Sequence, residues 1–295
     1  MKKTAYLGID GGGTKTDCAL CDSAGRIVRR QILRGCNPTV CGIDGMTAVL
    51  REGIAALSVG DYKVAGAFAG IAGCVSDERR NAIRSVLSSF FPGIPVDAHA
   101  DILNVVCLTE HRERCVAAIC GTGSAAFAVS GGDLFRVGGW GPLFDTAGSG
   151  YDVGREAIRA ALAEEDGFGE HTLLTEAVRQ KLGPSVFDGA ASLPANDPSA
   201  VAAFAPLVFA AEKKGDARAA SILRDNFARL AFLINRAAAL YSCGPHVVLA
   251  GGVTGETEAI GRYLAPALDP ELRLTVVTEA PVCGALAAAR ALAGK

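Results

Sequence analysis

The sequence predicts an α/β protein made of two similar units, each a mixed β-sheet covered by helices. The first observation behind this prediction is a repeat: a glycine-rich turn joins two apolar, strand-like runs at residues 9–14 and again at residues 119–124. The second is the composition, in which 50% of the residues are hydrophobic but only 6% are aromatic. At 295 residues the chain is long enough to bury the core of one large domain or two medium ones.

Apolar periodicity predicts the first unit in the order of three strands, helix, strand, helix, strand and helix. One of the helices carries Ile83, Val86, Leu87 and Phe90 at helical spacing along a single face. The strands are expected at residues 4–10, 17–22, 26–33, 63–69 and 94–100, and the helices at 42–57, from Ser76 or Asp77 onwards, and at 102–108.

The pattern restarts at Cys115, which places the predicted domains at residues 1–114 and 115–295. Residues 183–199 are rich in Pro, Gly, Ala and Ser and are expected to form an irregular surface excursion. The last helix, 284–293, is expected to pack back on the first domain. Strands are expected at 116–119, 125–129, 245–250 and 272–278, and the other helices at 151–165, 172–182, 200–214 and 217–241.

Both glycine-rich turns suit the binding of phosphate groups. Glycine adopts positive φ without strain, so the backbone can bend and bring its N–H groups close to an anion. Only the first turn carries a carboxylate, Asp10, where the second has Cys120. An acid beside a phosphate needs a cation between them, which indicates Mg²⁺ bound with a nucleotide. Ordinary hairpins with glycine turns are the alternative, and the repeat favours the phosphate interpretation.

Two other phosphate-binding patterns are set aside. Lys15 follows Thr14 rather than a glycine, so the P-loop pattern is missed. A dinucleotide fingerprint would need glycine where Thr16 stands, and a helix where residues 17–21 look like a strand.

Composition excludes several classes of protein. The formal net charge is −2 and no basic block interrupts the chain, so binding to nucleic acid or to a membrane surface has no electrostatic support. Asp10 interrupts the one N-terminal run that resembles a signal peptide, and no apolar run reaches the roughly 18 residues of a membrane span. We therefore expect a cytoplasmic protein.

The ten cysteines are expected to be reduced thiols, because the chain is long and carries no export signal. Cys18 and Cys21 form a C-x-x-C pattern, but on a strand they would face opposite sides, which argues against a metal or redox role. Cys120, inside the second turn, is the thiol expected near a ligand.

The two turns resemble the first and second phosphate motifs of the actin, heat-shock ATPase and hexokinase superfamily, and residues 247–253 resemble its adenosine motif. More narrowly, the chain resembles the BadF/BadG/BcrA/BcrD-type ATPase family, which includes N-acetylglucosamine kinases. The segments that carry this resemblance are Gly35-Cys36-Asn37-Pro38 and residues 70–73, 138–142, 148–155 and 281–285. The resemblance implies two ribonuclease-H-like (actin-like ATPase) domains, each with a mixed five-stranded sheet, flanking a cleft. It also implies that ATP is bound mostly by the second domain and sugar mostly by the first. We expect a homodimer.

Asp101 is the candidate catalytic base. It stands between an apolar strand and a helix, where loops meet ligands in open α/β sheets, and it matches the family's catalytic aspartate. A simple helix N-cap is the alternative. His99 would point to the opposite face of the strand, so a structural role is expected for it.

Asp10 is expected to hold Mg²⁺ through water, with stabilisation of its own turn as the alternative. Ordinary turn, packing or solvated roles stay open for Lys15, Asn37, Trp140 and Asp145. Contacts to ATP are expected from Gly11, Gly12, Gly13, Thr14, Lys15, Gly121, Thr122, Gly123, Ser124, Gly251 and Gly252. Contacts to the sugar are expected from Asn37, Gly73, Asp101, Thr122, Trp140 and Asp145.

One segment departs from the kinases that the chain resembles. They usually read Gly-Asp-Glu-Gly-Ser where this chain has Asp145-Thr146-Ala147-Gly148-Ser149. That acidic pair would help to bind the sugar, so the departure concerns the identity of the sugar more than ATP binding.

The expected activity is ATP-dependent phosphorylation of an amino sugar, N-acetylglucosamine to N-acetylglucosamine 6-phosphate, with glucosamine as an alternative substrate. A second class is an ATPase that activates a dehydratase or reductase partner, whose relatives carry an iron–sulfur cluster on cysteines. A third, a non-catalytic sugar sensor, is disfavoured by the presence of both Asp10 and Asp101.

Overall fold

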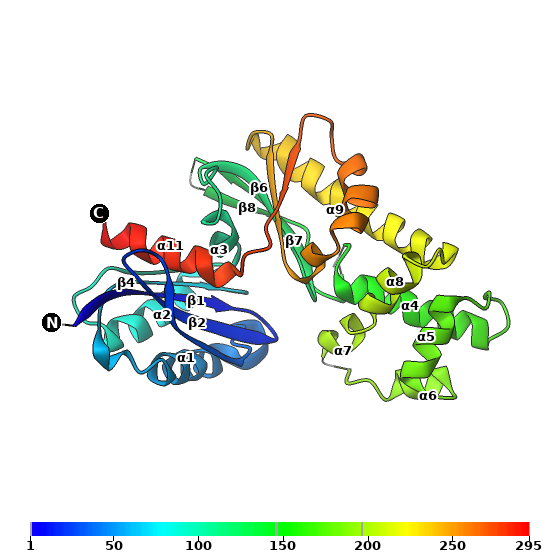
Figure 1. Ribbon diagram of the computed structural model, residues 1–295, viewed down its shortest axis with the longest axis horizontal. Helices are drawn as coiled ribbons and strands as arrows, with labels where there is room; N and C mark the ends of the chain where they lie inside the picture. The colour runs from blue at the N-terminus through cyan, green and yellow to red at the C-terminus, as the bar shows by residue number, and fades with distance from the viewer. Residues whose placement is uncertain (1, 132, 145–146, 196, 295) are drawn as a thin grey trace. The chain divides into compact units, whose positions relative to one another are not determined.

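The computed structural model describes residues 2–131, 133–144, 147–195 and 197–294. The chain divides into two compact units, Met1–Arg112 with Glu279–Lys295, and Glu113–Thr278. Each unit is built on one five-stranded mixed sheet with helices packed on it (Figure 1). This confirms the predicted fold class. The predicted domains, 1–114 and 115–295, differ from this division mainly at residues 279–295.

The first sheet has the strand order β3-β2-β1-β4-β5. Strands β1 (Lys3–Gly11), β2 (Lys15–Asp22) and β3 (Ile27–Arg34) form an antiparallel meander. Strands β4 (Tyr62–Ile71) and β5 (Val96–His99) then run parallel to β1. The three parallel strands therefore end at the same edge of the sheet, which is where ligands bind in open α/β folds.

Alternate residues of β1 belong to two different cores. Ala5, Leu7 and Ile9 are buried against α1 (Pro38–Ala56) and α2 (Asp77–Phe90). On the other face Tyr6 packs against α11 (Pro281–Ala293), which lies along β1 and β4, and next to α3 (Ile102–Val106) (Figure 1). A 3₁₀ turn, η1 (Val59–Asp61), precedes β4. The sheet is thus covered on both faces, which explains its long apolar strands.

Helix α1 begins at Pro38, four residues before the predicted start at residue 42. Asn37 caps it, since its Oδ1 accepts a hydrogen bond from the Thr39 N–H, and proline suits the first helical position. Gly42 interrupts the helix with φ of 70°. That break hides the first turn from the apolar periodicity that predicted the helix.

The second sheet repeats the arrangement with the order β10-β9-β6-β7-β8. Strands β6 (Arg114–Cys120), β7 (Ser124–Ser130) and β8 (Asp133–Val137) are antiparallel neighbours, and β9 (His246–Ala250) and β10 (Arg273–Val276) run parallel to β6. Helix α9 (Ala217–Tyr241) packs across β7 and β8. The remaining elements are α4 (Gly150–Glu165), α5 (Leu173–Leu182), α6 (Val186–Ala191), α7 (Pro198–Ala202), α8 (Ala205–Glu212), η2 (Gly252–Gly255), α10 (Thr257–Ala259), η3 (Ile260–Leu264) and η4 (Ala265–Ala267).

Two predictions for the helical part of this unit are wrong. Residues 183–199 are not irregular throughout, because Ser185 caps the short helix α6 and Val186 is buried in the core. The single helix predicted at 200–214 is divided into α7 and α8. Pro206 lies at the start of α8, where it lacks the N–H that a continuous helix would need.

Among the residues that the structure describes, no helix is long and apolar enough to span a membrane.

Candidate active site

The first glycine turn lies at the edge where β1, β4 and β5 end. The Ala72 N–H donates to the Gly11 carbonyl at 2.7 Å, and the Cys36 N–H donates to the Gly12 carbonyl at 3.1 Å. The turn itself closes with a bond from the Gly12 N–H to the Lys15 carbonyl at 2.8 Å. Gly13, Thr14 and Lys15 form the exposed tip of this turn.

Asp10 is the residue before the last in β1. It is hydrogen-bonded by a residue that sequence analysis did not identify. The Nδ2 group of Asn104 donates to Asp10 Oδ1 at 2.7 Å. Burial raises the pKa of Asp10 to about 6, opposed by this hydrogen bond and by the nearby Lys15. A carboxyl with a raised pKa is typical of functional sites.

The donor set fits a magnesium ion shared with a nucleotide. Asp10 supplies a carboxylate, and no group of three or more His, Cys, Asp or Glu side chains within the described residues is arranged to hold a metal alone. Mg²⁺ is usually bound through one or two carboxylates together with substrate phosphates and water. Asp10 is therefore the residue that would hold such an ion.

Asp101 follows β5 and caps α3, with its Oδ1 accepting from the Ile102 N–H at 3.1 Å. Asp101 is thus the N-cap of α3, and one of its two carboxylate oxygens accepts the capping hydrogen bond. Burial raises the pKa of the Cys36 and Cys74 thiols, and the negative charge of Asp101 adds a smaller contribution. Asp10 stands near the end of β1, and Asp101 follows β5, which runs parallel to β1, so both residues lie at one edge of the first sheet.

The imidazole of His99 packs against an aromatic ring of β4. Its ring stacks on Phe68 with 6.4 Å between ring centroids, and burial lowers its pKa. Phe68 packs against α11, on the far side of the sheet from α1 and α2. These contacts agree with the structural role expected for His99.

Asn37 and Gly73, both predicted to contact the sugar, are neighbours. Gly73 adopts φ of 77°, and a Cβ at this position would press against the Asn37 side chain. A second residue missed by sequence analysis, Arg79, donates from its guanidinium to the Gly73 carbonyl at 2.6 Å. The candidate sugar turn of this unit therefore carries a positive charge.

The second glycine turn is held by the start of α4. The Gly150 N–H donates to the Gly121 carbonyl at 2.7 Å, and the Tyr151 N–H donates to the Thr122 carbonyl at 3.0 Å. The Ser124 hydroxyl donates to the Ala147 carbonyl at 2.7 Å and is buried. Its proton is engaged within the protein in this structure, whereas Gly123 at the tip of the turn is exposed.

The paired glycines after β9 lie against the same turn. Gly251 adopts φ of 116°, and a Cβ there would overlap the Cys120 backbone. A Cβ on Gly121 would be in ordinary contact, 3.7 Å, with the Gly252 nitrogen, and Gly252 itself faces open space. The structure thus brings the predicted second phosphate turn and the predicted adenosine motif together in one unit.

The thiol of Cys120 points away from this turn. It is fully buried and donates to the Gly148 carbonyl at 3.2 Å. Burial raises its pKa to about 12, so it stays a neutral thiol. Cys18 and Cys21 belong to the cores on opposite faces of the first sheet, as predicted from their spacing on a strand.

Trp140 lies on a loop that packs on the second turn, because a Cβ on its neighbour Gly139 would overlap the Ser124 carbonyl. The indole is 62% exposed, and the Arg136 guanidinium lies 4.8 Å from its ring centroid. Asp145, the other predicted sugar contact of this loop, lies outside the described residues together with Thr146.

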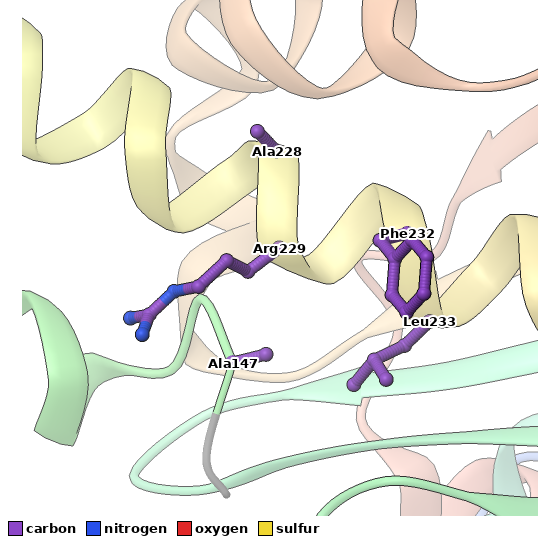
Figure 2. Close-up of a pocket in the computed structure, with 5 residues that line it drawn as sticks. All are labelled: Ala147, Ala228, Arg229, Phe232 and Leu233. Carbon is purple, nitrogen blue, oxygen red and sulfur yellow. The ribbon is translucent and has the colours of Figure 1, made fainter.

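A cavity of about 440 Å³ lies beside the same loop but contains none of the predicted site residues (Figure 2). Its wall is mostly apolar, and the Arg229 guanidinium at its rim donates to Asp152 Oδ2 at 2.8 Å. A sugar needs several polar partners, so this cavity is not the predicted sugar site. It is lined by Ala147, Ala228, Arg229, Phe232 and Leu233.

Solved structures of sugar kinases share this fold. The ROK family glucokinase from Streptomyces griseus, in complex with glucose and AMPPNP, matches with a TM-score of 0.64 and 20% identity over 97% of this chain and 98% of that one. The ROK hexokinase from Thermus thermophilus matches with a TM-score of 0.57 and 17% identity over 97% of each chain.

Sequence comparison identifies the family. The chain is 31% identical to the N-acetyl-D-glucosamine kinase of Dictyostelium discoideum over 254 residues, 80% of this chain and 79% of that protein. It is 29% identical to the N-acetylmuramic acid/N-acetylglucosamine kinase of Clostridium acetobutylicum over 57% of this chain and 56% of that protein. Residues 7–289 match the model of the BadF/BadG/BcrA/BcrD ATPase family. The chain therefore belongs to the BadF/BadG/BcrA/BcrD ATPase family.

Proposed function

We propose that the protein is an ATP-dependent kinase that phosphorylates an amino sugar, converting N-acetylglucosamine to N-acetylglucosamine 6-phosphate. The observation that carries this proposal is that Asp10 and Asp101 both lie at the edge of the first sheet where β1, β4 and β5 end, with Asp10 directly before the turn formed by Gly13 and Thr14. Both curated relatives named above are N-acetylglucosamine kinases, which supports the choice of substrate.

Phosphoryl transfer depends on positioned reactants, stabilisation of charge on the phosphates and a group that accepts the proton of the attacking hydroxyl. Asp101 is proposed to accept that proton from the 6-hydroxyl of the sugar. Nucleotide-bound Mg²⁺ supplies positive charge to the phosphates and is proposed to be held through water by Asp10. The exposed tips of the two turns, around Gly13 and Gly123, offer backbone N–H groups for the phosphates.

The proposed contacts to the sugar remain those expected from the sequence. Asn37, Gly73 and Asp101 are proposed contacts from the first unit, and Thr122, Trp140 and Asp145 from the second. Gly251 and Gly252 are proposed to carry the nucleoside, because paired glycines let a ligand lie on the backbone. Use of magnesium, a homodimeric state and a cytoplasmic location belong to the same proposal.

The test is ADP release from Mg-ATP with N-acetylglucosamine, glucosamine, N-acetylmuramic acid, glucose and no sugar compared side by side. Strong stimulation by N-acetylglucosamine is the expected result. Stimulation by glucosamine alone would replace the substrate but keep the reaction class. Equal ADP release with every sugar and without sugar would overturn the kinase in favour of an ATPase that acts on a partner protein.

A further inference from the structure

Asn104 contacts the side chain of Asp10 and, through its backbone N–H, the backbone carbonyl of Asp101. It lies in α3, three residues after Asp101, and its side chain is fully buried. Its Nδ2 donates to Asp10 Oδ1 at 2.7 Å and to the Gly70 carbonyl at 3.2 Å. An amide nitrogen carries two N–H groups, so both donors of Asn104 are used.

Two glycines fix the position of this asparagine. A Cβ on Gly70 would overlap the Asn104 side-chain amide, and a Cβ on Gly284 would overlap the Asn104 backbone carbonyl. Strand β4 thus lies against the side-chain amide, and the first turn of α11 lies against the backbone of the same residue. A side chain held in this way can impose one orientation on its hydrogen-bond partner.

Asp10 is the partner that is oriented. Within the described part of the chain, the Asp10 carboxylate is hydrogen-bonded by Asn104, and the bond goes to Oδ1. That bond favours the ionised carboxylate, against the burial that disfavours it. The second oxygen, Oδ2, is left as the one to accept a hydrogen bond from a cation-bound water.

The polar side chain of Asn104 lowers the stability of the fold at this buried position. The Oδ1 atom of Asn104 is buried and finds no hydrogen-bond partner within the described part of the chain. An unpaired buried acceptor is unfavourable, and an apolar side chain of similar size would avoid it. Orientation of Asp10 explains why an amide occupies this position.

We propose that Asn104 is the positioning residue of the cation site, holding Asp10 so that its free oxygen faces the magnesium of the bound nucleotide. This inference rests on the proposed function for the presence of the Mg-nucleotide. Asn104 touches neither substrate nor phosphate and acts through Asp10. The arrangement parallels metal sites in which outer residues orient the ligands and tune affinity.

The experiment measures how Mg²⁺ stabilises the protein in the presence of saturating ADP. The variants are Asn104→Ala and Asn104→Leu, which remove the donor with and without leaving a void. Val105→Ala is the matched control, since Val105 is equally buried in the same short helix. We expect the Mg²⁺ concentration for half-maximal rise in melting temperature to increase by roughly 10- to 100-fold in both Asn104 variants, the range found for other residues that orient metal ligands.

Val105→Ala should melt at lower temperature but keep the Mg²⁺ half-saturation of the unsubstituted protein. If the role of Asn104 were purely structural, the Asn104 variants would behave in the same way. In turnover assays the Asn104 variants should need more free Mg²⁺ while the KM for the sugar is unchanged. An unaltered Mg²⁺ requirement in the Asn104 variants, or an equal change in Val105→Ala, would overturn the proposal.

A double-mutant cycle keeps the test decisive if the Asn104 variants are poorly stable. Asn104→Ser, which retains a small polar side chain, is combined with Asp10→Asn. If Asn104 acts through Asp10, adding the serine to Asp10→Asn leaves the Mg²⁺ response unchanged, whereas a further loss contradicts the proposal. The thermal titration needs no sugar, so a protein that binds Mg-ADP but phosphorylates no sugar fails the proposed function alone. A protein that shows no Mg²⁺-dependent stabilisation with ADP overturns the role of Asn104 as well.

Discussion

Gly284, in the first turn of α11, lies directly against the backbone carbonyl of Asn104 in α3. A side-chain atom on Gly284 would occupy the space of that carbonyl group. The contact anchors the last helix of the chain beneath the loop that carries Asp101. Residues far apart in sequence are thus fixed next to each other at the candidate active site.

Gly284→Ala is expected to destabilise the first unit. Alanine in a helix is normally favoured over glycine by up to about 1 kcal/mol. Overlap with the Asn104 carbonyl opposes this gain, and overpacking of a close contact costs about 1–3 kcal/mol. The overlap should win, giving a lower free energy of unfolding in urea titrations. Gly294→Ala is the control, because its Cβ would meet its nearest neighbour at an ordinary 3.7 Å; equal stability of the two variants would contradict the prediction.

Asp101→Asn tests the proposed base while preserving the helix cap. Asparagine caps helices about as well as aspartate, so the bond from the Ile102 N–H should survive and the melting temperature should hardly change. Loss of a general base lowers turnover by about 10²-fold or more. ADP binding, measured by calorimetry, should remain. Asp77→Asn, at the exposed start of α2, is the control expected to keep full activity, and near-normal turnover in Asp101→Asn would rule out the base.

Ionisation of the buried Asp10 carboxyl is expected to lower the free energy of unfolding as pH rises. Its pKa is about 6 in the folded protein against 3.8 for the free side chain, so the folded state holds the proton more tightly between these values. Stability contributed by this group therefore falls as pH rises through that window, and the penalty is complete above pH 6. At about 1.4 kcal/mol for each pH unit, it approaches about 3 kcal/mol.

The Asp10→Asn variant removes this penalty and can still accept the hydrogen bond from Asn104. In buffer with EDTA it should be more stable than the unsubstituted protein above pH 6, with the difference vanishing as the pH approaches 3.8. Urea unfolding at several pH values measures the free energy of unfolding of the variant and of the unsubstituted protein. A variant that is less stable throughout would show that the carboxylate is not strained by burial. With Mg²⁺ and ADP added, the unsubstituted protein should gain more stability than the variant.

Much of the fold follows from local patterns. The repeated turns and the apolar strands around them predicted both sheets, because period-two burial and glycine turns are encoded by adjacent residues. Where local signals were broken, the predictions were wrong. Gly42 breaks the apolar periodicity of α1, so the first turn of this helix was not predicted. Pro206 lies at the start of α8, where the sequence analysis predicted one continuous helix.

The site was predictable only in part, for a similar reason. Asp10 and Asp101 each stand at the end of an apolar strand, a signal that the sequence displays directly. Asn104 and Arg79 have no such signal, because their roles come from contacts across the fold. Asn104 meets Asp10 across 94 positions of sequence, and Arg79 meets the Gly73 carbonyl only because Gly73 turns with positive φ. An asparagine in a short apolar helix was the one clue available.

Trp140 provides an optical test of the proposed sugar site. It is the only tryptophan in the chain, and its indole is exposed with Arg136 over the ring. If the sugar packs on it, the indole loses water and its emission should shift to shorter wavelength with a saturable dependence on N-acetylglucosamine. Trp140→Phe should abolish the signal and raise the KM for sugar, while the KM for ATP stays unchanged. Sucrose at equal concentration controls for viscosity. Unchanged emission at sugar concentrations that support turnover would remove Trp140 from the sugar site and leave its ring as a partner of Arg136 alone.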